Sequence, residues 1–322
     1  MNQPAQGQKY TPRVSIGMPV FNGEPFIRKA LDSLLAQTHT DFELIISDNA
    51  STDATAEICK EYAEKDGRIR YIRQPKNMEA LSNFNFVLDQ ARSEYFMWAA
   101  ADDIWHKNFL SKSFNYINNH GDIGVVFTKY WVTSRMYPLI KMRKLPNMGF
   151  LSNENTYDRI SSYILVKESS HKANLFYGLW RRSIAVKMME YSREIDKEEM
   201  CYGGDIAILM FILATTRAFQ IQEVLFFKTY KRFPPGHILD LISNLIISGP
   251  LNKSKNQFSS SCQSLIAQRH NKLLVNSLIK AGVYNEKYRE ILLAKLDADS
   301  TRYKGFSRIL CEFVSSLKVG IC

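Results

Sequence analysis

Strand-like and helix-like segments alternate along the first part of the sequence. The segments Arg13 to Val20, Phe42 to Asp48 and Ile69 to Arg73 are short and rich in apolar residues, as β-strands are. Turn residues follow the strands, and apolar residues then recur every three or four positions, as on one face of a helix. This alternation is typical of a mainly parallel, Rossmann-like sheet with helices on both faces. It predicts an α/β fold.

The stretch YFMWAAADDIW, residues 95–105, joins an apolar segment to two acids. The uncharged residues Tyr95 to Ala101 predict a buried strand, with Asp102 and Asp103 at its carboxyl end. Ligands of open α/β sheets bind at that edge. Neighbouring carboxylates repel each other unless a cation or hydrogen-bond donors offset the repulsion, so Mg²⁺ or Mn²⁺ shared with a substrate diphosphate would suit them. Alternatively, Asp102 caps a helix that begins near His106.

Further elements are expected beyond this stretch. They are a helix at Lys107 to Asn118, strands at Gly124 to Tyr130, Asn174 to Arg181 and Phe219 to Tyr230, and an apolar helix at Ile206 to Leu213. The basic, proline-containing residues from Thr133 to Met148 are typical of a solvated loop, although the region 133–172 could instead form a lid over an acidic ligand. We expect a flexible tail at 1–12, a main domain at 13–232 and a helical extension at 233–322.

Composition excludes several classes of protein. With 322 residues, 45% hydrophobic and 23% charged, the chain can bury a large core and is not disordered, collagen-like or a disulfide scaffold. No apolar run reaches the length of a membrane-spanning helix, and MNQPAQGQKY lacks the apolar core of a signal peptide, so we expect a cytoplasmic protein. The five cysteines form no C-x-x-C pair, which favours reduced thiols.

The net charge of +10 is concentrated in the second part of the chain, where residues 233–322 hold 12 Lys and Arg against 6 Asp and Glu. Such an excess suits nucleic acid, an anionic membrane or phosphorylated substrates. We find no nucleic-acid motif and expect no nucleic-acid partner. Tyr303 to Cys322 has an apolar helical face beside positive charge, which would suit a peripheral membrane surface, its own domain or a second subunit in a homo-oligomer.

Five separated motifs together resemble a known family. They are PVFNGE at 19–24, SDNASTD at 47–53, the segment from Asn77 to Asn83, AAADD at 99–103 and GGD at 203–205. Neither G-x-G-x-x-G nor G-x-x-x-x-G-K occurs, so a glycine-rich phosphate loop is not expected. Residues 13–232 resemble the inverting nucleotide-sugar glycosyltransferases of family 2, which have the GT-A fold. The shared order of the motifs carries this resemblance.

The resemblance implies which residues bind the donor. Pro19, Phe21, Asn22 and Glu24 would line the nucleotide pocket, with Phe21 stacking on the base. Asp48 would accept a hydrogen bond from a base N–H. Asn77 would belong to the donor pocket, although a polar helix start is an equal alternative, and Asp53 would only cap a helix.

The last two motifs imply the metal site and the catalytic base. In the family's D-x-D motif the first acid is here Ala100, so Asp102 would be the main ligand of Mn²⁺ or Mg²⁺, and Asp103 would contact sugar or ribose hydroxyls. In GGD the usual Glu is Gly204, and Asp205 would be the base, unless it only caps a helix. Lys228 or Lys231 would lie near the leaving diphosphate or simply on the surface.

The implied reaction is an inverting transfer of a sugar from a nucleotide-sugar, with UDP as the expected nucleotide, to a hydroxyl of a glycan or lipid-linked acceptor. Two alternatives remain open at this point. A sugar-phosphate nucleotidyltransferase also uses an α/β sheet and Mg²⁺, but it is associated with a glycine-rich N-terminal loop. A catalytically inactive nucleotide-sugar-binding module would explain the replacement of two acids by Ala100 and Gly204.

Overall fold

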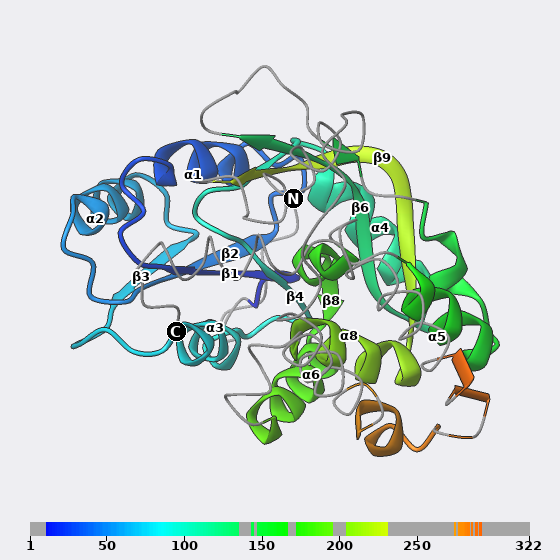
Figure 1. Cartoon of the computed structure of the whole chain (residues 1–322). Helices are drawn as coiled ribbons and strands as arrows, with labels where there is room; N and C mark the ends of the chain where they lie inside the picture. The colour runs from blue at the N-terminus through cyan, green and yellow to red at the C-terminus, as the bar shows by residue number, and fades with distance from the viewer. Residues whose placement is uncertain are drawn as a thin grey trace, which may run out of the picture.

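The fold is a curled, mixed sheet with helices on both faces (Figure 1). The structure is a computed structural model. It describes residues 11–134, 143–144, 147–166, 172–195 and 204–230, and part of the segment 274–291. Within these residues the sheet has nine strands, of which eight follow the order β3-β2-β1-β4-β8-β6-β9-β5, while β7 pairs with β6. The expected GT-A type of α/β fold is confirmed.

The first half of the sheet is parallel, as the alternating pattern predicts. Strand β1 pairs in parallel with β2 and β4, and β2 pairs in parallel with β3. Helices α1 and α2 lie on one face of these strands and α3 lies on the other (Figure 1). The elements are β1 (Val14–Val20), α1 (Ile27–Leu35), β2 (Phe42–Asp48), α2 (Thr55–Lys65), β3 (Ile69–Arg73), α3 (Ala80–Asp89) and β4 (Tyr95–Trp98).

The second half of the sheet is mixed. Strand β8 is antiparallel to both β4 and β6, β6 and β9 are parallel, and β5 and β7 pair antiparallel with β9 and β6. The elements are β5 (Ile104–Trp105), α4 (Phe109–Asn119), β6 (Ile123–Ser134), β7 (Arg143–Lys144), the 3₁₀ helix η1 (Gly149–Ser152), α5 (Thr156–Leu165), the 3₁₀ helix η3 (Lys172–Tyr177), β8 (Leu179–Arg181), α6 (Arg182–Glu194), α8 (Gly204–Thr215) and β9 (Arg217–Tyr230).

One strand predicted from the sequence, Asn174 to Arg181, is wrong in its first half. The chain there forms η3, and only the last three residues form β8. Gly178 separates the two, and a Cβ at this position would lie 2.7 Å from the backbone oxygen of Val126 in β6. The close approach of this segment to β6 therefore requires glycine at position 178. The strand β8 begins only after Gly178 and is shorter than predicted.

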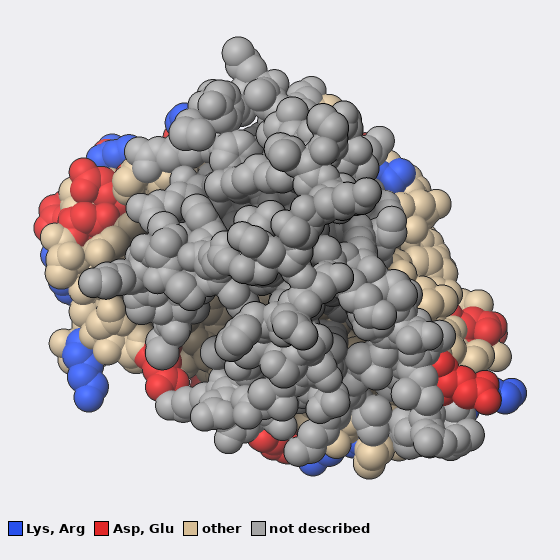
Figure 2. Space-filling view, in the orientation of Figure 1, with Lys and Arg blue, Asp and Glu red and all other residues tan. Residues whose placement is uncertain are grey.

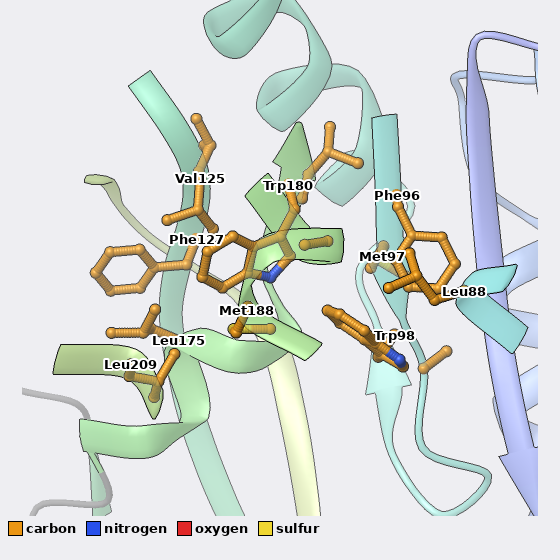
Figure 3. Close-up of a cluster of buried hydrophobic side chains, with 14 of the residues drawn as sticks. Leu88, Phe96, Met97, Trp98, Val125, Phe127, Leu175, Trp180, Met188 and Leu209 are labelled. Carbon is orange, nitrogen blue, oxygen red and sulfur yellow. The ribbon is translucent and has the colours of Figure 1, made fainter. Parts of the chain in front are cut away.

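Two tryptophans anchor the core where the two halves of the sheet meet. Trp98 of β4 and Trp180 of β8 are fully buried among apolar side chains (Figure 3). Their indole N–H groups are both satisfied, because Trp98 donates to the backbone oxygen of Phe84 at 3.1 Å and Trp180 to that of Phe176 at 2.8 Å. The Trp98 ring also stacks on Phe176, with 4.4 Å between centroids. These contacts fix η3 against the end of β4.

The edge formed by α1 and α2 carries charges of both signs. Figure 2 shows basic and acidic side chains side by side there, at the left of the view. Glu61 accepts from Arg28 of α1 at 2.8 Å and from Lys65 of its own helix at 2.7 Å. All three side chains are exposed, so these pairs contribute little to stability. This edge offers no single-sign surface for a polyanion.

Part of the segment 274–291 packs against α6. Residues 276–280 are helical, and Leu274 and Leu278 are buried. The hydroxyls of Ser277 and Tyr191, on α6, lie 2.8 Å apart in a buried hydrogen bond. The region Tyr303 to Cys322, for which a membrane surface, its own domain and a second subunit were the expected alternatives, lies outside the described residues. In the part of the chain that is described, no helix combines the length and apolarity needed to cross a bilayer.

Candidate active site

A pocket of about 230 Å³ opens at the carboxyl ends of β1 and β4. This is the edge of an open α/β sheet at which ligands bind. Its wall is made by the loop after β1, one residue of α3, the turn after β4 and the end of η3. The lining residues are Pro19, Val20, Phe21, Gly23, Phe26, Phe84, Ala100, Ala101, Asp102 and Tyr177.

A wider hollow of about 400 Å³ lies elsewhere, on α4. It is open to solvent and holds no carboxylate in its lining, so it lacks the acids that the expected metal and base chemistry requires. Its lining residues are Lys112, Asn115, Tyr116, Asn119, His120 and Ile221. The pocket at the sheet edge is therefore the candidate active site.

The two adjacent acids after β4 have different surroundings. Asp102 is partly exposed and lines the pocket, whereas Asp103 is fully buried. Asp103 accepts from Lys228 Nζ at 3.2 Å and from the backbone N–H of Thr229 at 2.9 Å. Burial raises the pKa of the Asp103 carboxyl to about 6, although the Lys228 ammonium favours the charged form. Both Asp103 oxygens are engaged with β9, so the expected contact with a sugar hydroxyl does not fit this arrangement.

Lys228 is not the exposed surface lysine that the sequence left as an alternative. Its side chain is only 14% exposed, and its Nζ lies 4.2 Å from the ring centroid of Tyr177. Tyr177 in turn lines the pocket. Sequence reasoning missed Tyr177, because the motif search found nothing at η3 and the surrounding residues were assigned to a strand. Lys231 lies outside the described residues.

Of the four residues expected in the first motif, two lie in the pocket wall. Pro19 and Phe21 line the pocket, and Phe21 is a large hydrophobic residue that is 44% exposed, which suits stacking on a base. Asn22 and Glu24 face the loop after β2 instead. Asn22 accepts from the N–H of Thr52 at 2.9 Å with a backbone φ of 50°, a left-handed conformation that asparagine tolerates.

Glu24 and Asp53 fasten the two loops to each other. The N–H of Glu24 donates to Asp53 at 3.1 Å, and the Glu24 carboxylate accepts from the N–H of Ala54 at 3.2 Å. Asp53 also accepts from the backbone and the hydroxyl of Thr55, at the start of α2. Glu24 therefore supports the pocket indirectly, by holding the loop after β1 in place. Asp53 accepts hydrogen bonds from the first residue of α2.

Asp48 is fully enclosed at the end of β2. One oxygen accepts from the N–H of Ser51 at 2.8 Å, and the other accepts from Tyr71 Oη at 2.8 Å and Arg73 Nη1 at 3.0 Å. The Asp48 side chain has no exposed surface, whereas 44% of the Arg73 side chain is exposed. A hydrogen bond from a nucleotide base to Asp48 would therefore require Tyr71 or Arg73 to move.

The segment from Asn77 to Asn83 is tied to the end of β2. Asn49 donates to the side-chain oxygen of Asn77 at 2.9 Å and accepts from the N–H of Met78 at 2.7 Å. Asn83 is buried and donates to the backbone oxygen of Ser47 at 3.0 Å. Asn77 is exposed and does not line the pocket. The next residue after the segment, Phe84, reaches the pocket wall instead.

Asp205 is the second residue of α8, directly after Gly204. Its side chain lies outside the described residues. At the other end of the helix, the buried guanidinium of Arg159 donates from Nε to the backbone oxygen of Leu213 at 2.8 Å. A cation bonded to the last turn of a helix favours the helix dipole. Helix α8 packs against η3, which ends at the pocket.

Asp102 is the described residue best suited to hold a metal. Among the residues that the structure describes, no three acids, histidines or cysteines converge as a ready-made metal site. A single carboxylate is nevertheless enough where a substrate diphosphate completes the coordination of Mg²⁺, which keeps several waters. The residues therefore fit a divalent ion held jointly by Asp102 and a diphosphate.

Comparison with curated proteins finds glycosyltransferases. The chain is 27% identical over 183 residues to "Glycosyltransferase GlyA" of Streptococcus pneumoniae, which covers 56% of this chain and 25% of that protein. It is 34% identical over 128 residues to "Uncharacterized glycosyltransferase MJ1057" of Methanocaldococcus jannaschii, covering 39% of this chain and 43% of that protein. The chain thus spans less than half the length of these relatives.

A solved structure shares the fold, and a family model matches half of the chain. TarS of S. aureus, residues 1–349, has the same fold with a TM-score of 0.52 at 19% identity, over 83% of this chain and 72% of that one. The same protein has also been solved with UDP-GlcNAc, with a TM-score of 0.51. The model described as "Glycosyl transferase family 2" matches residues 15–175, half of the chain. The protein therefore belongs to glycosyl transferase family 2.

Proposed function

We propose that the protein transfers a sugar from a nucleoside-diphosphate sugar to a hydroxyl of a glycan or lipid-linked acceptor, with inversion at the anomeric carbon. The observation that carries this proposal is the pocket in which Asp102 meets Pro19 and Phe21 at the carboxyl ends of β4 and β1. It combines an exposed aromatic ring for a base with a carboxylate for a metal-bound diphosphate. Family membership supports the same reaction.

Asp102 would bind Mn²⁺ or Mg²⁺ together with the donor diphosphate. The ion, when bound, neutralises charge that develops on the departing nucleoside diphosphate. Asp102 supplies the protein's share of the coordination. By the resemblance to the D-x-D motif, Ala100 takes the place of the first acid, so we propose that the donor contributes more of the ligands here than in proteins with the full motif.

Asp205 would act as the base that removes the proton from the acceptor hydroxyl. The proposal rests on its place at the start of the apolar helix α8 and on the packing of α8 against η3, whose Tyr177 lines the pocket. A positioned base accelerates such a step by typically 10²- to 10⁴-fold. The oxygen that loses its proton would attack the anomeric carbon in line with the departing diphosphate and from the opposite face, so the configuration would invert.

Uridine diphosphate is the first nucleotide to test. The TarS structure with UDP-GlcNAc makes that sugar nucleotide a sensible first donor, although the likeness to TarS shows the fold alone. The acceptor and the linkage are open to a screen. We also propose that the protein works in the cytoplasm, where nucleotide-sugars are made.

A panel of UDP-, GDP- and dTDP-sugars, each with Mn²⁺, tests the proposal by thermal shift. A ligand at 100 times its dissociation constant should stabilise the fold by about 2.7 kcal/mol. Release of nucleoside diphosphate from the winning donor then distinguishes an enzyme from a binding module. Binding without release, across a panel of acceptor sugars, would favour the inactive module, and stabilisation by none of the donors would contradict the proposal.

A further inference from the structure

Tyr177 is held rigidly at the end of η3. Its neighbour Phe176 stacks on Trp98 of β4 with 4.4 Å between centroids, and the backbone oxygen of Phe176 accepts from the indole of Trp180 at 2.8 Å. Both tryptophans are fully buried in the core (Figure 3). The Tyr177 ring itself lies 5.8 Å from the ring of Phe226 in β9. A side chain mounted in this way is suited to position a ligand.

The strand order places Tyr177 on the far side of Asp102 from the nucleotide motif. Strand β4 lies between β1 and β8 in the sheet. The loop carrying Pro19 and Phe21 follows β1, Asp102 follows β4, and Tyr177 directly precedes Gly178 and β8. A nucleotide with its base at Phe21 and its diphosphate at Asp102 would therefore extend its outer phosphate toward Tyr177.

Lys228 lies against Tyr177 on the side of β9. Its ammonium is 4.2 Å from the Tyr177 ring centroid and 3.2 Å from Asp103 Oδ2. Lys228 is not in the pocket lining, whereas Tyr177 is. Tyr177 therefore lies between the Lys228 ammonium and the pocket, and the ammonium acts on a ligand by polarising the tyrosine.

The Tyr177 phenol remains a hydrogen-bond donor at neutral pH. Burial raises its pKa, and the carboxylates of Asp103 and Asp102 act in the same direction, whereas the Lys228 ammonium opposes them. A protonated phenol next to an ammonium is polarised toward donation, and a phosphate oxygen is a strong acceptor.

We propose that the Tyr177 hydroxyl donates a hydrogen bond to the β-phosphate of the bound nucleoside diphosphate, with Lys228 as a positioning residue behind it. This inference rests on the proposed function and names a further residue of the same site. The hydrogen bond strengthens as the β-phosphate gains charge on departure of the sugar, so Tyr177 would favour the transition state as well as the product. No bond to Tyr177 forms or breaks.

The affinities of UDP and UMP, measured by calorimetry with Mg²⁺, test the contact, because only UDP carries a β-phosphate. Tyr177→Phe removes the hydroxyl and keeps the ring, so the fold should persist. A hydrogen bond to a charged group predicts that this variant binds UDP at least tenfold more weakly, while its affinity for UMP changes less than twofold. Tyr62→Phe, which loses a hydroxyl on α2 at a residue that does not line the pocket, is the matched control and should change neither affinity.

Lys228 variants test the positioning role through the same ratio of UDP to UMP affinity. Lys228→Met should lower the affinity for UDP relative to that for UMP. Lys228→Arg keeps the positive charge and should retain most of the wild-type preference for UDP. A purely structural effect would weaken UDP and UMP alike and would overturn the role of Lys228.

The two proposals fail in different ways. Wild-type protein that prefers UDP over UMP, with an unchanged preference in Tyr177→Phe, would overturn the Tyr177 contact and leave the proposed function standing. GDP with GMP and dTDP with dTMP serve as parallel probes. Wild-type protein that prefers none of the three diphosphates over its monophosphate would overturn both proposals.

Discussion

The ammonium of Lys228 lies 3.2 Å from Oδ2 of Asp103, joining two residues 125 positions apart in the sequence. Asp103 has no exposed surface, and the Lys228 side chain is 14% exposed. The pair fastens the turn that carries Asp102 to the end of β9. Removing one partner of a buried pair leaves an uncompensated charge, which is costly.

Lys228→Met should therefore lower the free energy of unfolding by about 3 to 5 kcal/mol. Asp103→Asn keeps an acceptor for the N–H of Thr229. In the double variant, Lys228→Met with Asp103→Asn, no buried charge remains unpaired. We expect the double variant to be more stable than the sum of the single effects predicts, by at least about 1 kcal/mol in a denaturant cycle. Additive effects would show that the two charges do not interact.

The Asp53 carboxylate predicts a dependence of stability on pH. Burial alone would raise its pKa, but hydrogen bonds from Thr55 and from the N–H of Glu24 outweigh burial and lower the pKa below its ordinary 3.8. A carboxyl with a lowered pKa in the folded state adds stability above the unfolded pKa and loses it as the pH falls through the folded value.

Asp53→Asn isolates this effect. The difference in free energy of unfolding between wild type and variant should be constant from about pH 5 to 7 and should shrink below about pH 4. The effect is modest because the site is partly exposed to solvent. Denaturant titrations at several pH values measure it, and a difference that grows on acidification would contradict the assignment.

Gly178 lies where η3 ends and β8 begins, so its substitution should disturb both the core and the site. A Cβ there would meet the backbone oxygen of Val126 at 2.7 Å, which neither chain segment can relieve by a side-chain rotation. We expect Gly178→Ala to destabilise the fold by about 1 to 3 kcal/mol and to weaken UDP binding through displacement of Tyr177.

Gly67→Ala is the matched control for Gly178→Ala. A Cβ at Gly67 would meet nothing within 4 Å, and its backbone is not left-handed. Alanine should be neutral there or stabilise the fold by up to about 1 kcal/mol, because it restricts the unfolded chain. Equal melting temperatures for the two variants would contradict the close approach of Gly178 to β6.

The pattern of the sequence predicted the parallel half of the fold well. Strand β2 was predicted with the same ends as in the structure, Phe42 to Asp48, because short connections and regular periodicity define such units. The mixed half was harder, since β8 has three residues and its neighbour η3 has no apolar period of its own. Helices α5 and α6 were not predicted.

The site was predictable where residues follow a strand end and not where distant segments meet. Asp102 and Phe21 were found from local motifs, and both line the pocket. Tyr177 and Lys228 are 51 positions apart in the chain, and nothing local indicates that they touch. The different surroundings of Asp102 and Asp103 depend on β9, which is distant in sequence.

Asp205→Asn separates a catalytic base from a helix cap. Asparagine keeps the size and capping ability of aspartate but cannot accept a proton from the acceptor hydroxyl. Sugar transfer should fall at least a hundredfold, as expected for loss of a positioned base, while donor affinity and melting temperature stay nearly unchanged. Near-normal transfer would make Asp205 only a cap, and the search for the base would move to Glu198 and Glu199.

The most direct test of the account is calorimetry of UDP binding with and without Mn²⁺, on wild type and Asp102→Ala. The account predicts that Mn²⁺ strengthens UDP binding in the wild type at least tenfold, as expected when an ion bridges a carboxylate and a diphosphate, and that this dependence disappears in Asp102→Ala. Asp89→Ala, which removes an exposed carboxylate on α3, should behave like wild type. Unchanged metal dependence in Asp102→Ala would contradict the central claim.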